Sequence, residues 1–386
     1  MDKVYYFDHA ASSWPKPPEV WLAMQQNIER SAANPGRGSH KMAVQASRTL
    51  FETRRELAKL FHISNPNDIS FTLNTTMSLN LAIKGYIKEG DHVICSSVEH
   101  NSVRRPIEYL KRTKRVEVTY VSSDAKGYFD IDTVKQAFKS NTSLFVITHA
   151  SNLLGSIHPI EEIAELCRSN NVKLLVDAAQ TAGTFPINVK QSGIDMIAFP
   201  GHKGLLGPQG TGGLYIDPSI DLEVHLHGGT GSQSEAIAQP MVRPDRYESG
   251  TQNTVGIAGL GAGLKVVSEK TVKKIYEHEF ALSQRLMEHL LRMEGIQLLG
   301  PNLGEPRVGL VSFTMEGIDS SEVAFILDQS YNIAVRSGYH CTPLAHETAG
   351  TVTTGAVRAS MGFYTTDSEV DYLAQAIKEI RKHYSI

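Results

Sequence analysis

Short apolar runs alternate with helical patterns between residues 69 and 216 of the chain. Most of the runs are continuous rather than alternating apolar and polar, as expected for strands buried on both faces. Segments with an apolar residue every three or four positions lie between several runs and predict helices. This order indicates an α/β fold with a mostly parallel, doubly wound sheet of seven strands. The predicted strands are residues 69–73, 93–97, 116–121, 144–148, 174–176, 196–199 and 213–216, and the helices between them are 79–87, 103–110, 134–138 and 160–167.

Other patterns flank this region. Before it, Pro17 and Pro18 open a helix with Val20, Met24 and Ile28 on one face, and a longer helix is expected over 42–61. After about residue 255, a helical stretch over 257–293 is interrupted near residue 269. Apolar segments at 308–314, 333–336 and 357–360 then predict a separate small sheet, and a last helix covers 368–383. We therefore expect an N-terminal arm of residues 1–14 that packs with the small domain, a large domain of residues 15–250 and a smaller α+β domain of residues 251–386.

Composition narrows the class of protein. The chain has 386 residues, of which 41% are hydrophobic and 20% charged, which suits a packed globular core. A net charge of −3 argues against nucleic acid or an anionic membrane as the main partner. No apolar run approaches the ~18 residues of a membrane span, and the first residues lack a signal-peptide pattern. Three cysteines are too few for a disulfide framework, so we expect a cytoplasmic protein.

Lys203 is the strongest candidate for chemistry. It follows the predicted strand 196–199 and precedes the glycine-rich run 207–213, while Asp177 closes the apolar run 174–176. A lysine amine for an imine, a carboxylate for a pyridinium nitrogen and a glycine-lined cup are what pyridoxal phosphate (PLP) requires of a protein. Each residue also has a simpler interpretation, because a lysine is usually a solvated charge and an aspartate often caps a turn.

Four further residues lie near predicted strand ends. Thr75 and Thr76 precede a helix expected to begin near residue 78, where they could hold a phosphate or cap the helix. Gln180 follows Asp177 by three positions and could meet a ring oxygen. His100 could stack on a flat ligand or serve as a structural hydrogen-bonding group.

Cys341 is the cysteine with the most polar surroundings. Arg336 and His340 lie nearby and would favour the reactive thiolate. Cys95 and Cys167 lie in apolar segments and are more simply core residues. Arg358 interrupts a small apolar strand, and a buried arginine needs an anionic partner, either a substrate carboxylate or a structural ion pair.

Taken together, the motifs resemble class V PLP-dependent enzymes, and among them cysteine desulfurases and selenocysteine lyases. The similarity spans essentially the whole chain in order. It is carried by Asp8-His9-Ala10-Ala11, Glu99-His100-Asn101, Ser151-Asn152-Leu153-Leu154-Gly155, Asp177-Ala178-Ala179-Gln180, Gly201-His202-Lys203, Gly250-Thr251-Gln252-Asn253 and the segment from Arg336 to Cys341.

The resemblance implies PLP fold type I, the aspartate-aminotransferase type, in a homodimer with sites at the interface. It implies conversion of L-cysteine to L-alanine, a persulfide on a cysteine and possibly a sulfur-acceptor protein, with no metal. By the resemblance, Lys203 would form the Schiff base and Cys341 would accept the sulfur. The cofactor ring would be contacted by Asp177, Gln180 and His100, of which His100 is also catalytic, and its phosphate by Thr75, Thr76, His202 and, from the other subunit, Thr251. The substrate would be bound by Asn152, Arg358, Arg336, Ala11 and Arg37.

Details of the motifs suggest a branch and show departures. Cys341 and Arg358 are seventeen positions apart, which resembles the Suf-type branch with its short cysteine loop. Pro200 stands where a phosphate-binding serine is common, Met77 where a glutamate is usual, and Gly36 where the Suf-type pattern has histidine. A selenocysteine lyase, and an aminotransferase or β-eliminating lyase of class V that does not need the thiol, are alternative functions. A PLP-binding regulator or sulfur-carrier scaffold is a further alternative.

Overall fold

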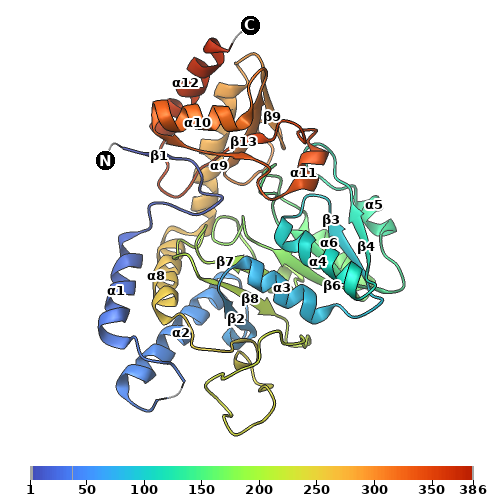
Figure 1. The fold of residues 1–386 in the computed structure, drawn as a ribbon, viewed down its shortest axis with the longest axis vertical. Coiled ribbons are helices and arrows are strands. Elements are labelled where there is room, and N and C mark those ends of the chain that lie inside the picture. Colours follow the sequence, from blue (N-terminus) through green and yellow to red (C-terminus); the bar gives the residue numbers. More distant parts are fainter. Residues whose placement is uncertain (1–2, 37, 385–386) are drawn as a thin grey trace.

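A seven-stranded sheet forms the centre of the larger part of the molecule (Figure 1). The computed structural model describes residues 3–36 and 38–384. The strand order is β2-β8-β7-β6-β5-β3-β4, and only β8 runs antiparallel to its neighbours. All the strands predicted between residues 69 and 216 are present, which confirms the expected fold class. They are β2 (Ile69–Thr72), β3 (His92–Ser96), β4 (Glu117–Val121), β5 (Thr142–Thr148), β6 (Lys173–Asp177), β7 (Met196–Pro200) and β8 (Gly212–Ile216).

Helices cover both faces of this sheet, which explains the continuous apolar runs. In β6, Leu174 and Val176 pack into one core and Leu175 into the other, because successive side chains of a strand point to opposite faces. The first core is closed by α2 (Lys41–Leu60), α6 (Ile160–Ser169) and α8 (Thr254–Lys270), and the second by α3 (Thr75–Tyr86) and α4 (Asn101–Thr113). The short helices α5 (Ile131–Gln136) and α7 (Val189–Ser192) lie in connections.

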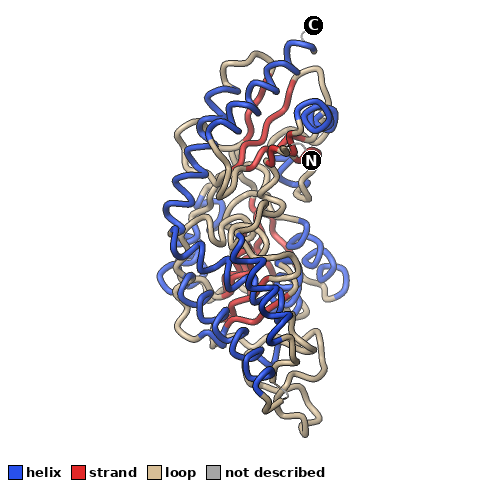
Figure 2. Tube along the Cα trace, turned by 90° about the vertical axis from the view of Figure 1, so that its left-hand side faces the viewer, coloured by secondary structure: helices blue, strands red, loops and turns tan. Residues whose placement is uncertain are grey.

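A smaller antiparallel sheet of order β12-β13-β10-β9 lies at the end of the molecule that carries both termini (Figure 2). Its core is filled by Phe313, Val357 and apolar residues of the neighbouring helices. The predicted strand 333–336 is two strands, and the sequence interpretation missed β9, α10 and α11. The elements are α9 (Val272–Leu290), β9 (Ile296–Leu299), β10 (Leu310–Met315), α10 (Ser320–Tyr331), β11 (Ile333–Ala334), β12 (Arg336–Gly338), α11 (Pro343–Thr348), β13 (Ala356–Ser360) and α12 (Asp367–His383).

The N-terminal arm connects the two sheets. Its strand β1 (Tyr5–Tyr6) pairs in parallel with β11, and Phe7 is fully buried in the core of the small sheet. Farther along, the Ser13 hydroxyl donates a hydrogen bond of 3.0 Å to the carbonyl oxygen of Lys203. The arm is therefore anchored at both ends, to the small sheet by β1 and Phe7 and to the loop after β7 by Ser13.

Two expectations about helices need comment. In α1 (Pro18–Ser31), Val20 is buried as expected but Ile28 is 60% exposed, so that part of the predicted face is wrong. The face that α1 turns inward instead includes Asn27, and Met24 packs against Gly259 of α8. The expected domain boundary at residue 250 stays a prediction; α8, which follows it, packs on α1 and α2 and belongs to the core of the large sheet. No helix in residues 3–36 and 38–384 is long and apolar enough to cross a bilayer.

Candidate active site

A cavity of about 210 Å³ lies where the carboxyl ends of the large-sheet strands face the small sheet. Ligands of doubly wound sheets bind at this edge. Most of the predicted site residues line this one cavity, although they come from distant parts of the chain. They are Ala11, Thr75, Thr76, His100, Asn152, Asp177, Gln180, His202, Lys203, Arg336 and Arg358.

Lys203 and Asp177 lie at the carboxyl ends of two neighbouring strands, with Asp177 the last residue of β6 and Lys203 in the loop after β7. Asp177 is only 2% exposed, and burial raises the pKa of its carboxyl to about 6, while its Oδ1 accepts a hydrogen bond of 2.9 Å from the Ala179 N–H. Burial, reinforced by the charge of Arg358, lowers the pKa of the Lys203 amine to about 8. Near neutral pH the site therefore combines a carboxylate with a lysine that readily loses its proton.

The start of α3 offers a place for a phosphate. Asn74 caps this helix by accepting a hydrogen bond of 2.9 Å from the Met77 N–H, so neither threonine is the cap. The Thr75 hydroxyl is buried without a partner, and the Thr76 hydroxyl lies 2.8 Å from the Ser102 hydroxyl. An orphaned buried hydroxyl at a helix N-terminus fits a phosphate oxygen, so the residues present fit PLP.

Ser102 is a cavity residue that the sequence interpretation missed. Its hydroxyl contacts both Thr76 and the His100 Nδ1 atom, at 2.8 and 2.9 Å. The only sequence signal for Ser102 is its place two residues after His100, at the start of a helix.

Pro200 stands at the position where a phosphate-binding serine is common. It ends β7 and has no N–H to donate.

His100 is a structural hydrogen-bonding group, and it also lines the cavity, while its stacking on a flat ligand stays a prediction. It caps α4, since its Nδ1 accepts a hydrogen bond of 3.1 Å from the Ser102 N–H, and it also lines the cavity. Burial, with the charge of Lys203, lowers its pKa to about 4, so the ring is neutral at physiological pH. His202 has its pKa lowered to about 4 for the same reasons, and its Nδ1 lies 3.3 Å from the Ser12 hydroxyl.

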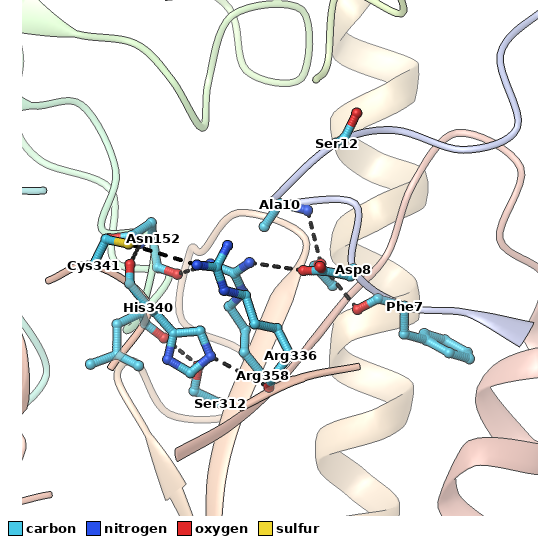
Figure 3. Close-up of polar contacts among 12 residues, drawn as sticks. Phe7, Asp8, Ala10, Ser12, Asn152, Ser312, Arg336, His340, Cys341 and Arg358 are labelled. Carbon is cyan, nitrogen blue, oxygen red and sulfur yellow. Dashed lines mark hydrogen bonds and ion pairs between the residues drawn. The ribbon is translucent and has the colours of Figure 1, made fainter. Parts of the chain in front are cut away.

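Cys341 lies on a turn that follows β12 of the small sheet. Both His340 and Cys341 have positive φ angles, 50° and 60°, a conformation that is rare for side-chain-bearing residues and concentrates at functional sites. The Arg336 Nη2 atom lies 3.7 Å from the Cys341 sulfur (Figure 3). The turn is fixed to the large sheet, because the Cys341 carbonyl accepts a hydrogen bond of 2.8 Å from the Asn101 N–H.

The expectation that His340 would help to form the thiolate is wrong. His340 is 3% exposed, and burial together with the charge of Arg358 lowers its pKa to about 2. A neutral imidazole supplies no positive charge to a sulfur. Positive charge near Cys341 therefore comes from the arginines Arg336 and Arg358.

Arg358 shows that its two proposed partners are not exclusive. The guanidinium is 1% exposed and donates to the Asn152 carbonyl at 2.9 Å and to the Asp8 carboxylate at 3.0 Å. A structural ion pair is thus present, with a residue of the first motif to which the sequence analysis had assigned no role. The Arg358 Nε has no partner among the described residues, so the guanidinium still has a donor for a substrate carboxylate. The Asn152 side-chain amide donates to the His340 carbonyl at 2.8 Å.

The structure does not place three predicted residues in the wall of this cavity. Cys341 contacts the wall residue Arg336 but is not part of the wall itself. Thr251 lines a separate cavity of about 330 Å³ together with Gly36 and Ser47. Arg37 lies outside the described residues. No cluster of His, Cys, Asp and Glu able to hold a metal ion occurs in the described part of the chain.

Comparison with known proteins decides the family. Residues 5–373 match the family described as Aminotransferase class-V. The chain belongs to this family. Its members use PLP, in agreement with the fit of the Thr75 and Lys203 environments.

Relatives of known name cover nearly the whole chain. A probable cysteine desulfurase of Methanothermobacter thermautotrophicus is 35% identical over 97% of this chain and 94% of its own length. The apo structure of cysteine desulfurase from Thermococcus onnurineus NA1 superposes with a TM-score of 0.93 at 32% identity, over 98% of this chain and 95% of that one. The cysteine desulfurase CsdA of Escherichia coli, in an S-sulfonic acid form, gives a TM-score of 0.89 at 26% identity, over 99% and 96%.

Proposed function

We propose that this protein is a PLP-dependent cysteine desulfurase that converts L-cysteine to L-alanine and carries the sulfur as a persulfide on Cys341. The observation that carries the proposal is the contact between the Cys341 sulfur and Arg336, whose side chain lines the same cavity as Lys203. Cys95 and Cys167 are buried in the two cores of the large sheet and have no such access. The names of full-length relatives support the same activity.

The large-sheet wall of the cavity would bind the cofactor and move the first proton. When bound, PLP supplies a protonated ring that accepts the electrons of a broken Cα–H bond. Asp177 would hold the ring nitrogen protonated, and Thr75 would donate its free hydroxyl to the phosphate. Lys203 would join the cofactor, then remove and return the substrate Cα proton; a pKa of about 8 leaves part of its amine neutral for this task.

Cys341 would carry out the sulfur transfer. Its thiolate attacks the substrate sulfur, so that an S–S bond forms while the substrate Cβ–S bond breaks. The electron pair of the broken bond stays on carbon, which takes up a proton and becomes the methyl group of L-alanine. The sulfur is oxidised as the carbon is reduced, so no external oxidant is required. The Arg336 Nη2 atom, 3.7 Å from this sulfur, lies beside the group that starts the step.

The proposal extends to the Suf-type branch, whose cysteine loop is short. Three features support a fixed loop here. The Cys341 carbonyl accepts a hydrogen bond from the Asn101 N–H, and the Thr342 hydroxyl donates one of 3.1 Å to the Glu99 carbonyl. The helix α11 begins directly after the loop, at Pro343. Because Cys341 contacts the cavity residue Arg336, we expect its thiol to reach the substrate without a large rearrangement.

A homodimer is part of the same proposal. Thr251 lines a cavity other than that of Lys203 in its own subunit. This placement is expected for a residue that contributes to the active site of a partner subunit. A sulfur-acceptor protein, which would take the persulfide sulfur from Cys341, is likewise expected.

The activity is tested by incubating PLP-loaded protein with L-cysteine and dithiothreitol and measuring sulfide and alanine together. The variants are Cys341→Ser and, as a matched control that removes a thiol elsewhere, Cys167→Ala. Equal amounts of both products from the wild type and Cys167→Ala, with loss in Cys341→Ser, are expected.

Other outcomes would point to the alternative functions. Sulfide release without alanine formation, surviving in Cys341→Ser, indicates a β-eliminating lyase. Turnover of L-selenocysteine but not of L-cysteine indicates a selenocysteine lyase. PLP-loaded protein that acts on neither substrate would contradict the proposal and direct the work to pairs of amino acids and keto acids.

A further inference from the structure

The Asp8 carboxylate belongs to the environment of the substrate cavity although the residue is not part of the cavity wall. Its Oδ1 accepts a hydrogen bond of 3.0 Å from the Arg358 Nη2, and no other partner of this carboxylate occurs in residues 3–36 and 38–384. Figure 3 shows the Arg358 guanidinium with Asp8 on one side and Asn152 on the other. Between them, these two contacts fix both Nη atoms.

The backbone that carries Asp8 is firmly held. The Phe7 N–H donates to the Ala334 carbonyl at 2.8 Å, and the Ser360 N–H donates to the Phe7 carbonyl at 2.7 Å. On the other side, the Ala10 N–H donates to the Ser360 hydroxyl at 2.9 Å. The backbone on both sides of Asp8 is thus anchored to the strand β13 that carries Arg358.

Charge gives this contact a second consequence. Lys203, Arg336 and Arg358 all line the cavity, so its wall is rich in positive charge. The Asp8 carboxylate acts on this wall from outside, and its charge is among those that raise the pKa of the Lys203 amine against the larger effect of burial. It balances the arginine without occupying the space in which a substrate would bind.

We propose that Asp8 is a positioning residue for the substrate carboxylate. By binding one Nη of Arg358, it holds the guanidinium so that the free donors, Nε among them, face an incoming α-carboxylate. Asp8 acts through Arg358 and does not touch the substrate. The inference rests on the proposed function in so far as the substrate is an α-amino acid.

The test compares Asp8→Asn and Asp8→Glu with the wild type, all loaded with PLP. The Kd of L-alanine is measured by titration of the cofactor absorbance, and KM and kcat are measured for L-cysteine. An amide binds a guanidinium more weakly than a carboxylate does, so Kd and KM should both rise by about tenfold in Asp8→Asn, with kcat within about twofold. Asp8→Glu keeps the charge but displaces the guanidinium, and should fall between the two.

Asp132→Asn serves as the matched control, because it removes a carboxylate that pairs with Lys135 on an exposed helix. Its Kd should equal that of the wild type. A lower Kd in Asp8→Asn would mean that Asp8 competes with the substrate for Arg358, and an unchanged Kd would mean that it has no role; either result overturns the inference. If Asp8→Asn fails to fold, the inference is tested with Asp8→Glu, which retains the ion pair with Arg358, by the same measurement of the Kd of L-alanine.

Failure of this inference is separable from failure of the proposed function. The L-alanine titration requires no desulfuration. A protein that binds L-alanine but releases no sulfide from L-cysteine would therefore contradict the proposed function alone.

Discussion

The two walls of the active-site cavity are built in different ways. The lysine wall, formed by Lys203, Asp177, Thr75 and His100, stands on strand ends and helix starts of the large sheet. The thiol wall, formed by Arg336, His340 and Arg358 and flanked by Cys341, whose sulfur contacts Arg336, stands on two strands of the small sheet and a turn with two positive φ angles. Regular structure fixes the first wall, whereas the turn of the second is held by hydrogen bonds to the first. The regular lysine wall suits a cofactor that stays bound, and the turn of the thiol wall suits a sulfur atom that is passed on.

The walls nevertheless act on each other electrostatically. Arg358 and Arg336 of the thiol wall both lower the pKa of Lys203, in addition to the larger effect of burial. Changes in one wall should therefore appear in the other only through charge or through the shared hydrogen bonds. The following substitutions test that division, in order of expected effect.

Lys203→Ala should break the function of both walls. Without the amine, neither cofactor attachment nor Cα proton transfer is possible, and we expect the rate of alanine formation to fall by about 10³-fold or more. Lys190→Ala, which removes an exposed lysine, is the control. A Lys203→Ala variant with a tenth of the wild-type rate would contradict the assigned role.

Cys341→Ala should break the thiol wall alone. Sulfide release is expected to fall by about 10²-fold or more, because the sulfur loses its acceptor. Binding of L-alanine to the PLP-loaded variant, followed by the cofactor absorbance, should match the wild type. A loss of L-alanine binding would show that the thiol is needed for more than sulfur transfer.

The pH dependence of cofactor uptake tests the coupling between the walls. Imine formation needs the neutral amine, and the Lys203 pKa is lowered to about 8. The rate of PLP uptake by cofactor-free protein should therefore rise as the pH increases toward about 8 and level off above it. Arg336→Gln removes a charge that lowers this pKa, so its profile should move to higher pH. Superimposed profiles would contradict the coupling.

Thr342→Val should have the smallest effect. The Thr342 side chain is fully buried and donates to the Glu99 and Val98 carbonyls at 3.1 and 3.3 Å. Losing this bond at nearly constant volume should lower the free energy of unfolding by about 1 kcal/mol in urea titrations. Cofactor uptake should be unchanged; a change of uptake rate would mean that the turn also shapes the lysine wall.

Much of the fold could be predicted because the signals were local. Continuous apolar runs such as that of β6 indicate strands buried on both faces, and each was found within a few residues of its predicted bounds. The failures depended on tertiary contacts. Ile28 is exposed because α1 packs on α8 through another face. The strand β9 has only four residues, and it is recognised as a strand by its pairing with β10 rather than by its own sequence pattern.

The site was predictable to a similar degree. Lys203 and Asp177 could be found because each follows a predicted strand, and such strand ends meet at one edge of a sheet. The partner of Arg358 could not be predicted, because Asp8 lies 350 positions away and only the folded arm brings it close. The neutral state of His340 depends on burial, which no spacing in the sequence discloses.

The most direct test of the central claim is the mass of the peptide that contains Cys341 after one turnover of L-cysteine in the absence of reductant. We predict a gain of one sulfur atom on Cys341, in proportion to the alanine formed, and no gain on Cys95 or Cys167. Alanine formed without sulfur on Cys341 would contradict the proposed role of this residue.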